Sequence, residues 1–256
     1  MRPHGWRAAP GPQPQRVGRQ VSLLAEPSAS PATDPPLAAP SGSAPFYQVL
    51  SNERTVTYWA HTAIPAAIRY GPGPRSKRRA TLHFSTEDGF AEIYVVRRRY
   101  VDRNGAEWLQ IRLPSRPNGR TGWVPRRALG PLYRVTTQLV INRAALRATL
   151  YREGQPIWTS RVGIGKASSP TPAGSFWIRE RLVVRPSGGL YGPLAFGTAA
   201  YSSLTDWPGG GVVGIHGTNQ PHLIPGRPSH GCIRVPNPAI LRLGGLMPLG
   251  TPIRIL

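Results

Sequence analysis

The sequence of 256 residues predicts a mainly β protein, in which two unlike β-rich domains follow a proline-rich leader. Two observations carry this prediction. Short apolar or aromatic runs are broken by glycine, proline and asparagine, as expected for strands joined by tight turns. A helical pattern follows the single cysteine, and the rest of that half of the chain is mostly strand-like. We expect a leader at 1–44, a first domain at 45–131 and a second domain at 132–256.

The leader contains nine prolines, with alanine and serine between them and few large apolar side chains. Such a segment buries too little surface to offset its ordering entropy, so we expect a disordered tether. Its basic residues precede an apolar stretch, 21–25, that is too short for the apolar core of a secretory signal. The sequence contains no apolar run of 18 residues, so no membrane-spanning helix is expected.

The first domain is expected to form a small β-barrel. Residues 91–96 and 107–112 alternate at period two, and Asp102 to Gly105 between them is a hairpin-turn signal. A further short strand is expected within 119–125. The stretch from Trp108 to Leu129 resembles bacterial Src-homology-3-like (SH3-like) domains, and this resemblance implies a binding or positioning role.

The second domain is expected to open with a hairpin, in which residues 148–151 and 156–162 flank a turn at Glu153 and Gly154. The apolar run 212–215 predicts a strand that ends at His216. Asn237 and Pro238 have the pattern of a helix N-cap followed by proline, and Gly244 with Gly245 is expected to end that helix. Residues 251–256 predict a final short strand.

The formal charge of +21 raises the possibility of an anionic partner. The excess is spread as +2 over 1–44, +9 over 45–130 and +10 over 131–256, which does not form one nucleic-acid-binding stripe. The tightest clusters are residues 77–79 and 97–99. A solvated surface is the main interpretation, and binding of an anionic wall polymer or a nucleic acid is the alternative.

Cys232 is the single cysteine of the chain, so no intramolecular disulfide is possible. A reactive cysteine needs an imidazole or a positive environment, together with N–H groups where an oxyanion forms. Two histidines compete for the role of base. His230 lies two residues from the cysteine, whereas His216 is remote in sequence, and spacing alone favours neither. A zinc site made by the histidines and Cys232 fits no common ligand spacing.

The motifs around these residues resemble the L,D-transpeptidase catalytic domain family (YkuD-like). His216 and Gly217 are followed, after about a dozen residues, by Ser229, His230, Gly231, Cys232, Ile233 and Arg234. Residues 162–166, residues 169–176 and the Tyr-Gly-Pro segment at 191–193 are similar to earlier motifs of that family. The resemblance covers nearly all of 132–256.

The resemblance implies a role for each matching residue. Cys232 would be the nucleophile and His216 its base or ion-pair partner, with the other ring nitrogen held by the Gly217 carbonyl. Backbone N–H groups of His230, Gly231 and Cys232 would form the oxyanion hole. Three further positions that match the family are expected at the oxyanion or substrate-binding site: Ser229, Arg234 and Tyr191.

The implied reaction has two steps. Cys232 attacks the L-centre carbonyl of a tetrapeptide stem and expels the terminal D-alanine, and an amine from a neighbouring stem then takes the acyl group. This would make the protein a peptidoglycan cross-linking enzyme of the cell envelope that needs no cofactor or metal, and we expect a monomer. Water in place of the amine would make it an L,D-carboxypeptidase, and a non-catalytic polymer binder is the distant alternative.

Overall fold

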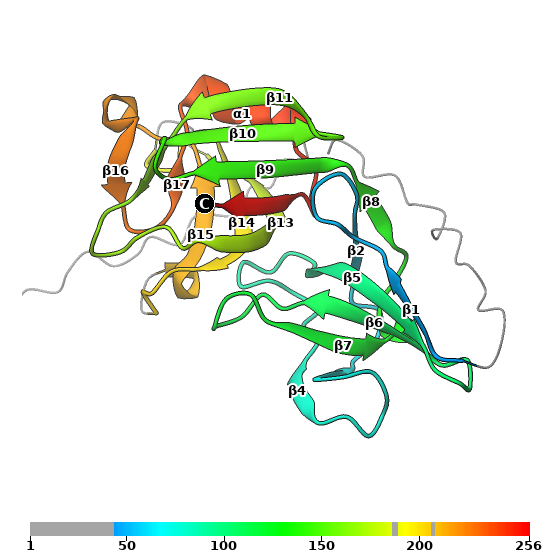
Figure 1. Cartoon of the computed structure of the whole chain (residues 1–256). Coiled ribbons are helices and arrows are strands. Elements are labelled where there is room, and N and C mark those ends of the chain that lie inside the picture. Colours follow the sequence, from blue (N-terminus) through cyan, green and yellow to red (C-terminus); the bar gives the residue numbers. More distant parts are fainter. Residues whose placement is uncertain (1–43, 186–188, 206–207) are drawn as a thin grey trace, which may run out of the picture.

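A computed structural model describes residues 44–185, 189–205 and 208–256 (Figure 1). The predicted leader, apart from residue 44, lies outside the described residues. The described chain is mainly β, as predicted, with 18 strands in two sheets and one α-helix. Among the described residues, no helix is long and apolar enough to cross a membrane.

The first sheet has the strand order β4-β3-β7-β6-β5-β2-β8, and β1 pairs with β5. Its strands are β1 Phe46–Val49, β2 Thr57–His61, β3 Ala67–Arg69, β4 Arg78–Thr81, β5 Ile93–Val101, β6 Glu107–Arg112, β7 Thr121–Pro125 and β8 Tyr133–Val135. The predicted hairpin is present as β5 and β6, with Gly105 at φ 77° in its turn. Because β8 pairs with β2, this sheet extends past residue 131, to Val135. The resemblance to SH3-like domains stays a prediction.

The second sheet has the order β11-β10-β9-β18-β13-β14-β15-β17-β12-β16. Its elements are β9 Thr137–Asn142, β10 Arg147–Arg152, β11 Gln155–Arg161, β12 Gly163–Gly165, β13 Gly174–Val183, β14 Leu194–Tyr201, β15 Val212–His216, β16 Gly226–Ser229, β17 Ile233–Arg234, helix α1 Asn237–Leu246 and β18 Pro252–Ile255. The predicted hairpin is β10 and β11, and the predicted final strand is β18. Sequence reasoning missed β13 and β14, the long central strands.

Helix α1 differs from its prediction at both ends. Pro236 occupies the N-cap position, and Asn237 makes no capping hydrogen bond because its side-chain oxygen accepts the N–H of Thr218 instead. Gly244 and Gly245 lie inside the helix and do not end it. The buried side of the helix, at Ile240 and Leu243, packs on the core of the second sheet.

The two sheets share a hydrophobic cluster, and the first sheet has a second cluster of its own. Trp59, Ile93 and Val95 of the first sheet belong to the same buried cluster as Phe176 and Trp177 of the second. The indole N–H of Trp177 donates to the carbonyl of Ile93 at 3.1 Å. In Figure 1 the strands β4 to β7 lie below the strands β9 to β11. We call this contact between the sheets the seam, and it makes the two regions one packed body.

Charged groups also cross the seam. Arg179 on β13 is 2% exposed and forms an ion pair with Glu92, which is 0% exposed. A second guanidinium nitrogen of Arg179 lies 2.9 Å from Glu87. The segment 84–92, between β4 and β5, therefore lies against the central strands of the second sheet.

The predicted cationic cluster at 97–99 is partly neutralised in the fold. Arg97 pairs with Glu53 at 3.1 Å, and Arg99 pairs with Glu107 on the neighbouring strand. Ion pairs therefore neutralise two of the three arginines of this run within the first sheet.

Candidate active site

Cys232 lies in a tight turn between β16 and β17 that Ser229 holds closed. The buried Ser229 hydroxyl donates to the carbonyl of Cys232 at 2.6 Å and accepts the N–H of Gly231 at 3.1 Å. Gly231 has φ 126°, a conformation that side chains other than glycine rarely adopt. Cys232 as a residue is partly exposed, although its thiol group is largely buried.

A segment that is distant in sequence supports the same turn. The Thr171 hydroxyl donates to the carbonyl of Gly231 at 2.8 Å and accepts the N–H of Gly165 at 2.9 Å. A side chain on Gly165 would overlap the backbone of residues 169–171, so this strand end needs glycine. The two motifs at 162–166 and 169–176 thus pack against the Cys232 turn and hold it in place.

His216 ends β15 directly beside this turn. A carbon built on Gly214 would lie 3.7 Å from His216 Cδ2 and 3.8 Å from Cys232 Sγ, so the ring and the thiol face the same point. His216 Nδ1 lies 2.6 Å from the carbonyl of Gly217, and a carbonyl can only accept, so Nδ1 carries the hydrogen. Nε2, next to Cδ2, is then the nitrogen that can accept a proton.

Burial keeps both groups neutral. It lowers the pKa of His216 to about 4, against a smaller opposing effect of the Gly217 hydrogen bond. Burial also raises the pKa of the Cys232 thiol, and the N–H of Gly214, 3.4 Å from Sγ, opposes that rise. At neutral pH the resting pair is therefore a thiol and a neutral imidazole, which is the protonation state in which a histidine can act as a base.

The Tyr191 ring contacts the imidazole of His216. The two rings meet edge to face with centroids 4.8 Å apart, and Tyr191 is 38% exposed. The next residue, Gly192, has φ 62° and packs so closely on Gly217 that neither position has room for a side chain. Asn237 of α1 closes this contact, since its side-chain oxygen reaches the Thr218 N–H at 2.8 Å.

The structure separates the two candidate bases. His230 is exposed, and its Nε2 lies 3.0 Å from the Lys166 ammonium nitrogen. His216 is 3% exposed and faces the thiol. Geometry therefore favours His216 as the base, which spacing in the sequence could not decide.

Arg234 lies on β17 beside His216, in parallel register. Its guanidinium donates to Gln220 at 2.9 Å, and its positive charge lowers the pKa of His216 and of Cys232 by smaller amounts than burial changes them. Its side chain orders the loop after β15, and no described contact directs it to the thiol.

The predicted oxyanion donors are not equivalent. The Gly231 N–H is already bonded to Ser229, whereas the Cys232 N–H makes no hydrogen bond within the described chain. The turn therefore offers the Cys232 N–H to an incoming carbonyl oxygen more readily than that of Gly231.

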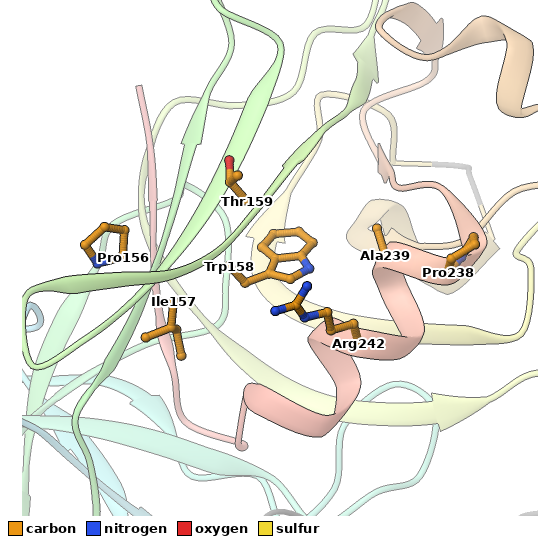
Figure 2. Close-up of a pocket in the computed structure, with 7 residues that line it drawn as sticks. All are labelled: Pro156, Ile157, Trp158, Thr159, Pro238, Ala239 and Arg242. Carbon is orange, nitrogen blue, oxygen red and sulfur yellow. The ribbon is translucent and has the colours of Figure 1, made fainter.

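Two hollows in the described part of the chain have similar volumes. One, of about 490 Å³, adjoins the turn, because its lining residue Ser202 packs against Gly231. The other, of about 500 Å³, lies between β11 and α1, where Trp158 and Arg242 face each other (Figure 2). The candidate site residues line neither of these two hollows, and the first is the one that adjoins the Cys232 turn. Within the described ranges, no group of three or more His, Cys, Asp or Glu could hold a metal ion.

Sequence reasoning missed two residues that shape the site. Thr171 supports the Gly231 carbonyl, and Asn237 ties α1 to the loop after His216. Thr171 lay inside a recognised motif, but its partner is 60 residues away. Asn237 was assigned to capping, because a helix start offers that simpler use for its side chain.

A buried imidazole of fixed tautomer beside the thiol of a partly exposed cysteine is the arrangement used by enzymes with a cysteine nucleophile. The family model described as the L,D-transpeptidase catalytic domain (YkuD) matches residues 136–255. The YkuD protein of Bacillus subtilis (strain 168) is 32% identical over 123 residues, which are 48% of this chain and 68% of that protein. The YkuD protein of Bacillus licheniformis is 37% identical over 48% of this chain and 65% of its own length. The chain belongs to the L,D-transpeptidase catalytic domain family.

Solved structures of this family also match. The avibactam carbamoyl enzyme of an L,D-transpeptidase named Ldtfm is 26% identical with a TM-score of 0.37, over 47% of this chain and 48% of that chain. The L,D-transpeptidase of Mycobacterium smegmatis is 14% identical with a TM-score of 0.39, over 59% of this chain and 90% of that chain. The present chain thus spans about half of the first of these structures.

Proposed function

We propose that this protein is a peptidoglycan L,D-transpeptidase of the cell envelope, with Cys232 as nucleophile and His216 as base. The observation that carries the proposal is the meeting of Cys232 Sγ and the His216 ring at Gly214, with the proton of the imidazole held on Nδ1 by Gly217. Family membership supports the substrate class, which is the stem peptide of the wall.

In the first step, the Cys232 thiol transfers its proton to His216 Nε2 as sulfur attacks the L-centre carbonyl of a tetrapeptide donor. The Cys232 N–H stabilises the oxyanion. The carbon–nitrogen bond to the terminal D-alanine then breaks, and the imidazolium returns the proton to the leaving amine. The product is a thioester on Cys232 and free D-alanine.

In the second step, an acceptor amine attacks the thioester and gives a proton to His216 as the carbon–sulfur bond breaks. His216 passes this proton to the departing sulfur, so the cross-link forms and the resting thiol is restored. Water as the attacking group would release the acid, so adding an acceptor amine and resolving the products by mass distinguishes transpeptidase from carboxypeptidase.

The test follows D-alanine release and the mass of the intact protein with a stem tetrapeptide as donor. We expect a thioester adduct on the wild-type chain and none on Cys232→Ala. The His216→Ala variant should acylate about 10²- to 10⁴-fold more slowly, because it loses its general base. A carbapenem should likewise label the wild type fastest, His216→Ala more slowly and Cys232→Ala not at all. Absence of both D-alanine release and adduct in the wild type contradicts the proposal.

A further inference from the structure

The segment between β6 and β7 reaches from the first sheet to the second, close to the Cys232 turn. Arg116 of this segment has its Nη2 nitrogen within hydrogen-bond distance of three backbone carbonyls. They are those of Ser202 at 3.0 Å, Leu204 at 3.0 Å and Gly210 at 2.9 Å. These carbonyls belong to the two ends of the connection between β14 and β15. One guanidinium group of the first sheet therefore holds both ends of that connection together.

Asn118 of the same segment makes a second attachment beside the first. Its side-chain nitrogen donates to the carbonyl of Tyr201 at 2.8 Å, and its side-chain oxygen accepts the N–H of Tyr201 at 3.1 Å. The Arg116 guanidinium also lies over the Tyr201 ring, 4.8 Å from its centre, as in a cation–π contact. The end of β14 is thus bound to side chains of the first sheet through its backbone and its ring.

The connection held in this way packs on the Cys232 turn. A side-chain carbon built on Gly231 would lie 3.2 Å from Ser202 Cβ, which is closer than an ordinary contact, and Ser202 is 7% exposed. The N–H of Ser202 donates to the carbonyl of Gly211 at 2.9 Å, so the two ends of the connection also bond to each other. Gly231 directly precedes Cys232, whose N–H is the candidate oxyanion donor. The position of Ser202 therefore limits how far this part of the turn can move.

Hydrogen bonds, and not apolar packing, hold the connection at this place. In the described part of the chain, neither hydrophobic cluster includes Ser202 or Leu204. The hollow of about 490 Å³ is lined by Arg116 and Asn118 from the first sheet and by Ser202 and other residues of the second. Hydrogen bonds from a charged donor are stronger than those between neutral groups. Removal of the Arg116 guanidinium should therefore loosen the connection without opening either hydrophobic cluster.

We propose that Arg116 is a positioning residue for the candidate nucleophile, through which the first sheet takes part in catalysis. Arg116 keeps the two ends of the β14–β15 connection together, and Ser202 then holds Gly231 in place. The Cys232 N–H is thereby kept directed at the oxyanion that forms during acylation. This inference rests on the proposed function. It extends that function to a residue outside the matched catalytic domain, which spans 136–255.

The test compares two reactions of the same thiol in the full chain. Acylation by a carbapenem forms an oxyanion and uses the Cys232 N–H, whereas alkylation by iodoacetamide displaces iodide and forms no oxyanion. Arg116→Met should slow acylation about ten- to a hundredfold, as expected for a displaced oxyanion donor, and leave alkylation within about twofold of the wild type. Arg116→Lys keeps a positive charge and three N–H donors, so it should recover most of the acylation rate.

Asn118→Ala provides a second variant at the same contact. It removes the two hydrogen bonds to Tyr201 and leaves Arg116 in place, so acylation should slow by a smaller factor, about three- to tenfold. Alkylation should again stay within about twofold of the wild type. If Arg116→Met does not fold, the same comparison of the two reactions is made on Asn118→Ala.

Arg103→Met is the matched control, because Arg103 is exposed in the turn between β5 and β6 of the same sheet. It should change neither reaction. Unchanged acylation in Arg116→Met, or an equal slowing of acylation and alkylation, would overturn the inference while leaving the proposed function in place. A wild type that is alkylated at Cys232, but neither releases D-alanine from a stem tetrapeptide nor reacts with a carbapenem, would overturn both.

Discussion

The turn around Cys232 and the seam between the sheets are organised on different scales. In the turn, Ser229 bonds to residues two and three positions away. At the seam, Arg179 bonds to Glu92, which is 87 positions away. The turn is a local motif that can be recognised by its residue order. The seam depends on two distant segments meeting, and it brings the carboxyl groups of Glu180 and Asp88 together.

The largest effect is expected from breaking the seam. Arg179→Met would leave Glu92 buried without its cation, which should lower the free energy of unfolding by about 3–5 kcal/mol. Urea denaturation measures this. Arg97→Met is the control, because the Arg97–Glu53 pair is closer to the surface and should contribute under about 1 kcal/mol. Equal losses in the two variants would show that the buried pair does not hold the sheets together.

Acid should lower the free energy of unfolding through His216. Its folded pKa of about 4 lies below the unfolded value near 6.5, so the unfolded chain takes up a proton first as pH falls. The contribution of His216 to the free energy of unfolding is fully present above pH 6.5. It is lost as pH falls through 4, by about 3 kcal/mol in all. Glu180, whose pKa is raised to about 7, acts in the opposite direction over part of this range.

The measurement is therefore the difference in unfolding free energy between the wild type and His216→Gln, followed from pH 7.5 to 4. Subtraction removes the Glu180 effect, which is common to both proteins. A difference that stays constant with pH would mean that the buried imidazole is not held neutral.

A smaller effect is expected in the turn itself. Ser229→Ala removes two hydrogen bonds, and unfolding free energy should fall by about 1–2 kcal/mol. Acylation of Cys232 should slow severalfold, because the Gly231 N–H and the Cys232 carbonyl lose their common partner. Ser160→Ala, whose hydroxyl bonds only to the next carbonyl at an exposed position, should change stability by less than about 0.5 kcal/mol. Similar losses in the two variants would contradict a special role of Ser229.

Local patterns predicted much of the fold. The β5–β6 and β10–β11 hairpins were visible because turn residues such as Asn104 with Gly105 stand between alternating runs. Strands β13 and β14 were missed because they are buried on both faces and lack that alternation. The start of the helix was misassigned because Asn237 has a tertiary partner that a local rule does not include.

By itself, the sequence determined the β-rich class, the family resemblance and the pair of candidate catalytic residues, because these depend on residue type and order over short stretches. Tertiary structure decided that His216 and not His230 faces the thiol, since strand β15 delivers it there from a distance. It also placed the Glu180 carboxyl over Gly197, where it accepts the hydroxyl of Thr86 from the segment between β4 and β5. Such contacts depend on strand register and on packing across the seam, and no local pattern in the chain encodes either of them.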